Sequence, residues 1–270
     1  RCQLRFFYRY VCELKEPDST EDDLIDNRLF GNIFHKAAQL VYQYLVATKA
    51  TITTMAIDDL LKEEVTIERV VDEAIKLDFF HIPDASRPLP PLDGLQLINR
   101  EVIIKYLRQL LECDRRLAPF SILGLEKPVN ITLNNQYIAG VIDRLDSITD
   151  PETGLERIRV VDYKTGSRQM KAMPDVAAIF SQEAIKDHSD YFLQTLLYAH
   201  IVRSKTPQMV SPCLLFIQHA GSEDYDPTLK IGKEAITDIA DYSDEFITLL
   251  RQQLDDIYNA QMAFVPTDDQ

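Results

Sequence analysis

Residues 140–146 read GVIDRLD and residues 160–166 read VVDYKTG, and these two runs decide the fold of the chain. If the chain between them turns back as a β-hairpin, Asp143 comes opposite Asp162. Strand side chains alternate between faces, so Lys164 points the same way as Asp162, and a suitable register brings Asp143 beside them. Two carboxylates and an ammonium at the end of an apolar hairpin are costly to bury unless they bind something. The pattern therefore predicts a site for a divalent cation.

A turn signal separates the two runs. Residues 150–154 read DPETG, which favours a turn because proline presets φ and glycine accepts positive φ. A simpler interpretation makes Asp143 and Arg144 an exposed pair, since single acids at strand ends are mostly structural. The combination of an acid, a hairpin and then Asp-x-Lys-Thr-Gly indicates a functional site more strongly than any one residue does.

A helix is predicted over residues 27–47, where apolar residues recur at helical spacing, among them Leu29, Ile33, Leu40 and Tyr44. This helix carries His35. Gly31 lies four residues earlier on the same face, where its missing side chain would admit a close neighbour or a phosphate. A lone histidine is more often an ordinary surface or core residue than a metal ligand, so spacing alone leaves the role of His35 open.

The chain divides into a mainly helical part and a part that begins with strands. Helical spacing marks residues 24–47, 56–79 and 95–117, and four prolines over residues 83–91 separate the last two. Strand-like runs follow over residues 121–164, with Asn134 and Asn135 as a first hairpin turn. The remaining elements are expected to be a helix over 191–203, a buried strand over 210–218 and a long helix over 235–262.

Strands enclosed by helices predict an α/β or α+β fold. We expect one structural unit with two parts: residues 1–118 as a helical lobe that carries His35, and residues 119–270 as a core with the hairpin and a closing helix. The sequence shows no repeat of 20 to 50 residues and no Gly-x-x-x-x-Gly-Lys-Ser/Thr loop, so an ATP-driven motor would lie elsewhere.

Composition limits the function classes. The net charge of −14 argues against a free-standing nonspecific DNA-binding protein, because affinity for nucleic acid comes largely from Lys and Arg. Basic residues do form three local clusters: Arg1, Arg5 and Arg9; Arg108, Arg115 and Arg116; and Lys164, Arg168 and Lys171. The third cluster adjoins the predicted site and is the strongest candidate for contacting phosphates. The acidity indicates a domain that works inside a larger assembly.

The sequence has no apolar run near the ~20 residues needed to cross a bilayer, and no secretory signal. Its four cysteines form no C-x-x-C pair, which fits a reducing cytosol better than a disulfide framework. The expected location is therefore the cytoplasm, with no membrane partner.

Four segments carry a family resemblance: residues 30–35 (FGNIFH), 140–146 (GVIDRLD), 162–166 (DYKTG) and 194–199 (QTLLYA). With these motifs the chain resembles the PD-(D/E)XK nuclease superfamily, specifically its RecB-like and AddB-like branch. The resemblance implies a restriction-endonuclease-like core, in which a mixed central sheet is flanked by helices. It also implies a Mg²⁺- or Mn²⁺-dependent nuclease that cuts DNA in recombination or repair, with a helicase domain or subunit as partner.

The resemblance also implies roles for individual residues. The expected metal ligands are His35, Asp143, Asp162 and the backbone carbonyl of Tyr163, and the histidine nitrogen suits Mn²⁺ better than Mg²⁺. Lys164 is the expected catalytic base, or the cation that orients the attacking water.

Further residues are implied on the helices and the first strand. Gln194 and Tyr198 lie four apart on one helix face and are expected to line the groove, in contact with DNA or the lysine. The expected substrate-binding residues are Gly31, Thr165 and Arg168. Glu126, at the end of a strand predicted over residues 121–125, resembles the family's acid on the first core strand, and we rank it below the two aspartates.

The first residues resemble the opening segment of RecB-like and AddB-like nuclease domains, in which a cysteine precedes several aromatic residues. In AddB-type members, that cysteine joins three later ones to hold a [4Fe–4S] cluster, and residues 262–270 resemble the segment before those three. Cluster ligation needs four converging thiolates. We therefore expect no cluster in this chain, and we consider Cys2 a candidate ligand in a longer parent polypeptide, of which a chain that begins at Arg1 is expected to be a piece.

Two alternatives from other classes remain at this point. The domain could be a catalytically silent DNA-binding or scaffolding module of the same fold. It could also be a protein-interaction domain in which the motifs are coincidental, a hypothesis that the acidic charge favours. The sequence leaves strand polarity and the preference for single or double strands open. It does not decide between cutting from ends and cutting internally, although the resemblance favours end processing.

Overall fold

The two runs of sequence around the acids pair as a hairpin. The structure is a computed structural model that describes residues 3–14, 25–48, 50–84, 86–150, 154–167 and 171–265. In it, β3 (Gln136–Thr149) runs antiparallel to β4 (Glu156–Lys164), and the last paired residues are Arg144 and Val161. One step further along this register, Asp143 lies opposite Asp162. Gly154 lies in the connection with φ of 69°, a left-handed conformation that glycine adopts readily.

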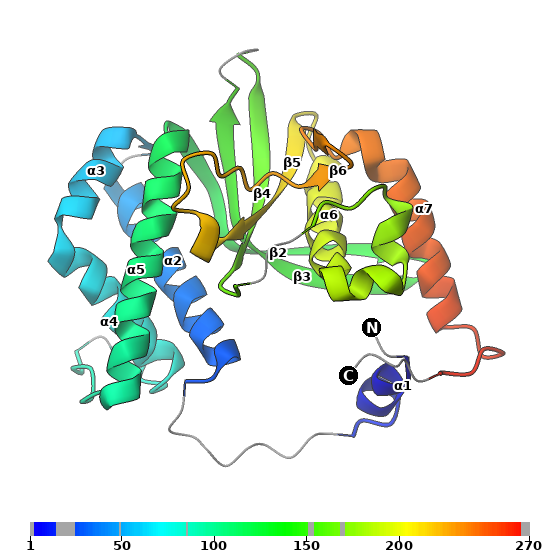
Figure 1. Ribbon diagram of the computed structural model, residues 1–270, viewed down its shortest axis with the longest axis horizontal. Helices are drawn as coiled ribbons and strands as arrows, with labels where there is room; N and C mark the ends of the chain where they lie inside the picture. The colour runs from blue at the N-terminus through cyan, green and yellow to red at the C-terminus, as the bar shows by residue number, and fades with distance from the viewer. Residues whose placement is uncertain are drawn as a thin grey trace.

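Five strands make the central sheet, in the order β1 (Thr51–Ile52), β2 (Phe120–Leu133), β3, β4 and β5 (Met209–Phe216). The first three neighbouring pairs are antiparallel, whereas β4 pairs with β5 in parallel, so the sheet is mixed. The sheet is curled and helices flank it (Figure 1). This architecture confirms the predicted α/β fold class.

The strand β2 is longer than predicted. The sequence predicts an end near Leu125, but β2 continues to Leu133 and turns into β3 through Asn134 and Asn135. The reason is local: β1 pairs only with the first residues of β2, so Pro128 lies where β2 is an edge strand and a missing N–H is tolerated.

The far half of the β2–β3 hairpin bends away from β4 and runs past α6 (Ser189–Arg203) toward α7 (Ala240–Ile257) (Figure 1). At its tip, Asn134 Nδ2 donates to the backbone oxygen of Arg251 at 3.1 Å and to Asp255 Oδ1 at 2.7 Å, and both acceptors belong to α7. Asp143 therefore lies at the point where β3 separates from β4.

Four helices pack on one side of the sheet: α2 (Asn27–Thr48), α3 (Thr54–Lys62), α4 (Glu64–Asp78) and α5 (Gly94–Leu117). Their core with the sheet includes Phe34, Val41, Ile75, Leu107 and Val161. The predicted single helix over residues 56–79 is wrong, because Glu63 has a non-helical ψ of 74° and separates α3 from α4. α5 begins at a capping box, in which the Asp93 side chain accepts from the N–H of Gln96 at 2.8 Å.

On the other side, α6 (Ser189–Arg203) and α7 cover a second core that includes Val160, Leu196, Leu214 and Phe246 (Figure 1). Shorter elements connect them: η2 (Ala177–Phe180), η3 (Glu183–Asp187), η4 (Ile217–His219), β6 (Lys230–Ile231) and β7 (Glu234–Ala235). The helix α7 starts later than predicted, because Ala235 pairs in β7 and the Asp238 side chain accepts from the N–H of Ala240 at 3.1 Å.

The first and last described segments lie side by side (Figure 1). The helix α1 (Gln3–Phe6) continues into the π-helical turn η1 (Phe7–Val11), and the rings of Phe6 and Phe7 lie 6.2 Å and 5.2 Å from that of Phe264. The N–H of Val265 donates to Gln3 Oε1 at 3.2 Å. Over the part of the chain that the structure describes, no helix has the length and apolarity to span a bilayer.

Candidate active site

Three side chains from three elements meet where β3 separates from β4. His35 comes from α2, Glu126 from β2 and Asp143 from β3, and one ligand atom of each lies within 4.8 Å of the other two. His35 Nδ1 is 3.2 Å from Asp143 Oδ1. Two of the predicted metal ligands are therefore adjacent, and the residue that we ranked lower, Glu126, joins them.

Glu126 faces Asp143 because of the hairpin register, in which its two chain neighbours pair with the two neighbours of Asp143. Its φ is 47°, a left-handed conformation that is uncommon for glutamate and that concentrates at functional positions. Burial, and then the charge of Asp143, raise the pKa of the Glu126 carboxyl. Asp162 is outside this group of three.

Tyr163 holds Asp143 and His35 in position. Its backbone N–H donates to Asp143 Oδ2 at 2.7 Å. Its ring meets the imidazole of His35 edge to face, with 5.8 Å between centroids and 83° between planes. Asp143 is thus fixed through one oxygen and offers the other toward His35. The carbonyl of Tyr163 remains a predicted ligand.

Asp162 and Lys164 form an ion pair beside this group, with 2.6 Å between Asp162 Oδ2 and Lys164 Nζ. Asp162 is only 4% exposed, and burial, partly offset by Lys164, raises its pKa to about 6. Burial lowers the pKa of Lys164, but the charge and hydrogen bond of Asp162 outweigh this effect, and the pKa rises above its usual value. Lys164 therefore carries a positive charge at neutral pH.

One imidazole nitrogen and two carboxylates fit a divalent cation, because hard cations prefer oxygen ligands and imidazole suits Mn²⁺ and similar ions. Burial lowers the pKa of His35, but the hydrogen bond and charge of Asp143 outweigh it, so that the pKa is raised. The arrangement that raises the pKa of His35 attracts a proton to its imidazole. A cation held by His35 and the two carboxylates would compete with that proton.

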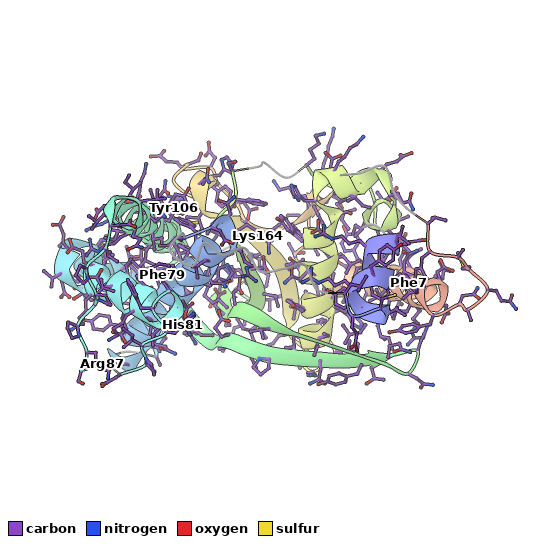
Figure 2. The ribbon with its side chains drawn as sticks, turned by 90° about the horizontal axis from the view of Figure 1, so that it is seen from below. Phe7, Phe79, His81, Arg87, Tyr106 and Lys164 are labelled. Carbon is purple, nitrogen blue, oxygen red and sulfur yellow. The ribbon has the colours of Figure 1, made fainter. Side chains whose placement is uncertain are left out.

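A cleft of about 880 Å³ opens beside Lys164, between α2, α5, the end of β4 and the start of α6. Figure 2 shows Lys164 near the middle of the molecule, with Tyr106 of α5 on the side of the helical part. Gly31 and Thr165, two of the predicted substrate-binding residues, line this cleft. A Cβ on Gly31 would lie 3.7 Å from Thr165 Oγ1, so α2 closely approaches the loop after β4. The third, Arg168, lies outside the described residues.

Residues 1–269 match the PD-(D/E)XK nuclease superfamily. The chain belongs to this superfamily. Membership implies a metal-dependent nuclease, with DNA as the class of substrate that a nuclease of this kind suggests. No curated protein matches the sequence.

The sequence pattern in the superfamily's name can be located in the site of this PD-(D/E)XK protein. Asp162, Tyr163 and Lys164 supply the (D/E)XK part at the end of β4, and Asp143 supplies an acid on the neighbouring strand. The hairpin thus places Tyr163 and Lys164 on the wall of the cleft and Asp143 in the His35–Glu126–Asp143 group.

Gln194 and Tyr198 lie on α6, facing the β2–β3 hairpin. Gln194 Nε2 is 3.4 Å from the hydroxyl of Tyr198, and a Cβ on Gly140 would overlap that hydroxyl and the ring next to it. Gly140 is therefore needed for the close approach of the ring to β3. Neither side chain is among the described residues that line the cleft, and their contact with DNA or Lys164 remains a prediction.

The sequence interpretation missed two residues beside Lys164. The ring of Tyr191 lies 4.6 Å from Lys164 Nζ, and the ring of His188 stacks on Tyr191. Tyr191 lies three residues before Gln194 on α6, so extending the face of Gln194 and Tyr198 by one turn would have included it. No spacing signal marks His188.

The arginines of the second basic cluster form contacts within the protein. Its guanidinium groups are bonded to acids or backbone oxygens of neighbouring elements: Arg108 to Leu61, Arg115 to Asp58, and Arg116 to Ala220 and Ser222. In the third cluster, Lys171 pairs with Asp187 at 2.9 Å. Of the described arginines and lysines, Arg28 and Lys164 line the cleft.

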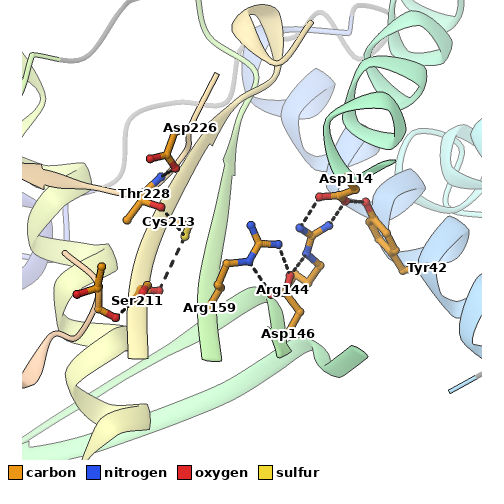
Figure 3. Close-up of polar contacts among 10 residues, drawn as sticks. Tyr42, Asp114, Arg144, Asp146, Arg159, Ser211, Cys213, Asp226 and Thr228 are labelled. Atoms are coloured by element: carbon orange, nitrogen blue, oxygen red, sulfur yellow. Dashed lines mark hydrogen bonds and ion pairs between the residues drawn. The ribbon is translucent and has the colours of Figure 1, made fainter. Parts of the chain in front are cut away.

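Figure 3 shows a buried ion-pair network formed by Asp114, Arg144, Asp146 and Arg159. Arg144, the neighbour of Asp143 in β3, pairs with Asp114 of α5 and with Asp146. Asp146 also pairs with Arg159 of β4 at 2.8 Å. The interpretation of Asp143 and Arg144 as an exposed pair is wrong, because Arg144 is 0% exposed.

The network also reaches the helix that carries His35. The hydroxyl of Tyr42, in α2, donates to Asp114, and the guanidinium of Arg144 lies 4.8 Å from the centroid of the Tyr42 ring and 5.7 Å from that of Tyr163. The network therefore connects α2, α5, β3 and β4. Of these elements, α2 supplies His35, β3 supplies Asp143 and β4 supplies Lys164.

Proposed function

We propose that this chain is a DNA nuclease domain of the RecB/AddB type, which hydrolyses phosphodiester bonds at DNA ends during recombination or repair. The observation that carries the proposal is the convergence of His35, Glu126 and Asp143 within 4.8 Å, beside a charged lysine at the wall of a cleft.

The metal site of this proposal consists of His35, Glu126 and Asp143, with Asp162 and the Tyr163 carbonyl as the further predicted ligands. When bound, a Mg²⁺ or Mn²⁺ ion would polarise the scissile phosphate and lower the pKa of a bound water. The chain itself supplies the orientation: Tyr163 fixes Asp143 through its N–H, and its ring confines the imidazole of His35.

Lys164 acts in this proposal as the cation that orients the attacking water, and it lines the cleft where the substrate would lie. It can donate hydrogen bonds to a phosphate oxygen or to the attacking water, and so stabilise charge that develops in the transition state.

The acidic charge of the chain supports a role inside a larger machine. With a net charge of −14, the domain depends on Lys164, Arg28 and the bound cation for local attraction of phosphates. A helicase domain or subunit would hold the rest of the DNA and deliver it to the cleft. The partner would then make most of the contacts with DNA phosphates, so most of the counterions released on DNA binding would come from its contacts.

The [4Fe–4S] cluster that the resemblance implies for Cys2 stays a prediction. Cys2 lies outside the described residues, but the neighbouring segment, residues 3–11, packs against Phe264 and Val265. Of the described cysteines, Cys113 and Cys213 are buried in separate elements, and Cys12 is exposed.

Cleavage of end-labelled linear DNA and of closed circular DNA, each with Mg²⁺, Mn²⁺ or EDTA, tests the function. We expect linear DNA to be degraded from its ends with Mn²⁺ or Mg²⁺, and no cleavage in EDTA. Cleavage of the closed circular DNA would show that the enzyme cuts internally, and this mode would then replace the proposed end processing. DNA binding without cleavage under any metal would favour the silent scaffolding module, and neither binding nor cleavage would favour the interaction domain.

A further inference from the structure

The ammonium of Lys164 has two described contacts, and they differ in kind. One is the ion pair with Asp162 at 2.6 Å, and the other is the aromatic ring of Tyr191, whose centroid lies 4.6 Å from Nζ. The face of an aromatic ring attracts a cation, most strongly where water is excluded. Because an ion pair alone leaves a flexible lysine free to rotate about its carboxylate, the second contact limits where the ammonium can point.

Tyr191 is itself held by His188. The two rings are stacked, with 4.8 Å between centroids and 8° between planes, and both line the cleft with Lys164. Backbone hydrogen bonds fix the turn on which they lie: the N–H of His188 donates to Ile185 O at 3.1 Å, and the N–H of Tyr191 donates to His188 O at 3.0 Å. His188 is the residue that joins η3 to α6.

His188 carries two unfavourable features for the fold. Its φ is 60° and its ψ 42°, the left-handed conformation that glycine and asparagine adopt more readily than histidine. Neither ring nitrogen has a hydrogen-bond partner among the described residues, although both are buried, and the Asp190 Oδ1 atom is 3.9 Å from Nδ1. Strained backbone and unsatisfied buried polar atoms both lower stability and concentrate at functional sites.

We propose that His188 and Tyr191 are positioning residues for Lys164: the His188 ring fixes Tyr191, and the Tyr191 ring holds the ammonium toward the substrate cleft. The inference rests on the proposed nuclease function. It gives a reason for a histidine at a position where asparagine would suit the backbone better. Neither residue is expected to contact the metal or to transfer a proton.

Four variants separate positioning from simple packing. Tyr191→Phe keeps the ring and should keep turnover within about twofold of wild type. Tyr191→Leu removes the ring and should lower kcat about 10- to 30-fold, the scale of a desolvated cation–aromatic contact, with KM changed less than about threefold. Tyr137→Leu, at an exposed tyrosine of β3 that is 70% accessible, is the matched control and should leave kcat unchanged.

The fourth variant, His188→Asn, gives the sharpest distinction. Asparagine tolerates the left-handed backbone and removes the unsatisfied ring nitrogens, so the melting temperature should equal or exceed that of the wild type. We expect kcat to fall about fivefold nevertheless, because the Tyr191 ring loses its support. A loss of melting temperature in proportion to activity, or wild-type kcat in both His188→Asn and Tyr191→Leu, would overturn the proposal.

Lysine ¹³C NMR provides a readout that does not depend on activity. The Cε signal of Lys164, assigned with Lys164→Arg, should be displaced by the ring current of Tyr191, keep that shift in Tyr191→Phe and lose it in Tyr191→Leu. If the wild type cuts no DNA, the proposed function fails while this contact is still tested. If the wild type cuts DNA but the Cε signal is the same in Tyr191→Leu, the positioning role alone fails.

Discussion

Replacing Lys164 with methionine is expected to lower the rate of metal-dependent DNA cleavage by about 10²- to 10³-fold, the effect of removing one preorganised donor from a transition state. Methionine has a similar length but no charge, so it removes the cation that faces the cleft and keeps most of the packing. The measurement is single-turnover cleavage of end-labelled DNA in Mn²⁺, with melting temperatures recorded beside it.

Lys62→Met is the matched control for this variant. Lys62 also pairs with an aspartate, but its side chain is 76% exposed and its partner, Asp59, lies on the same helix, α3. We expect its cleavage rate within about twofold of the wild type, because an exposed ion pair contributes little. If Lys164→Met keeps more than a tenth of wild-type activity, the lysine is not part of the catalytic group.

Replacing Arg144 with methionine is expected to lower the free energy of unfolding by about 3–5 kcal/mol, the usual effect of removing one partner from a buried ion pair. Arg144 is completely buried, and its removal leaves Asp114 without an ionic partner among the described residues and Asp146 with one fewer. Urea unfolding at equilibrium, followed by circular dichroism, measures the change.

Arg87→Met is the control for the same substitution at the surface. Its side chain is 70% exposed, and its guanidinium is 3.8 Å from Asp84, so the expected change is within about 0.5 kcal/mol. A loss of less than about 1 kcal/mol in Arg144→Met would show that the network is not needed to hold α5 against β3.

Much of the fold can be predicted because its signals are local. In the sequence, the turn residues over 150–154 and the paired asparagines Asn134 and Asn135 mark two hairpins, and strand-like runs flank both. The break between α3 and α4 could not be predicted in this way, because Glu63 is an ordinary helix former. The helices on either side of it pack into one core, through Leu60 before the break and Ile67 after it.

The site was predictable where residues lie close in sequence. Asp143, Asp162 and Lys164 follow from a single hairpin, whereas the place of Glu126 depends on a second one. A two-residue turn fixes the register of its strands, so counting outward from Asn134 and Asn135 places Glu126 opposite Asp143. The signal for Glu126 was therefore present in the sequence, although we ranked that residue lower.

Other parts of the site depend on tertiary contacts that no local pattern encodes. Asp114 and Arg144 belong to elements that are separate in the chain, and their pairing becomes visible only when α5 packs on the sheet. The same holds for His188, whose ring meets Tyr191 because the chain reverses through a left-handed residue between η3 and α6.

Calorimetric titration with Mn²⁺ tests most directly whether His35, Glu126 and Asp143 form one cation site. We predict a saturable isotherm for the wild type, at least about 10-fold weaker binding in Glu126→Gln and Asp143→Asn, and unchanged binding in Asp59→Asn, whose side chain is 64% exposed. No saturable binding by the wild type, or the same affinity in Glu126→Gln and Asp143→Asn as in the wild type, would contradict the account.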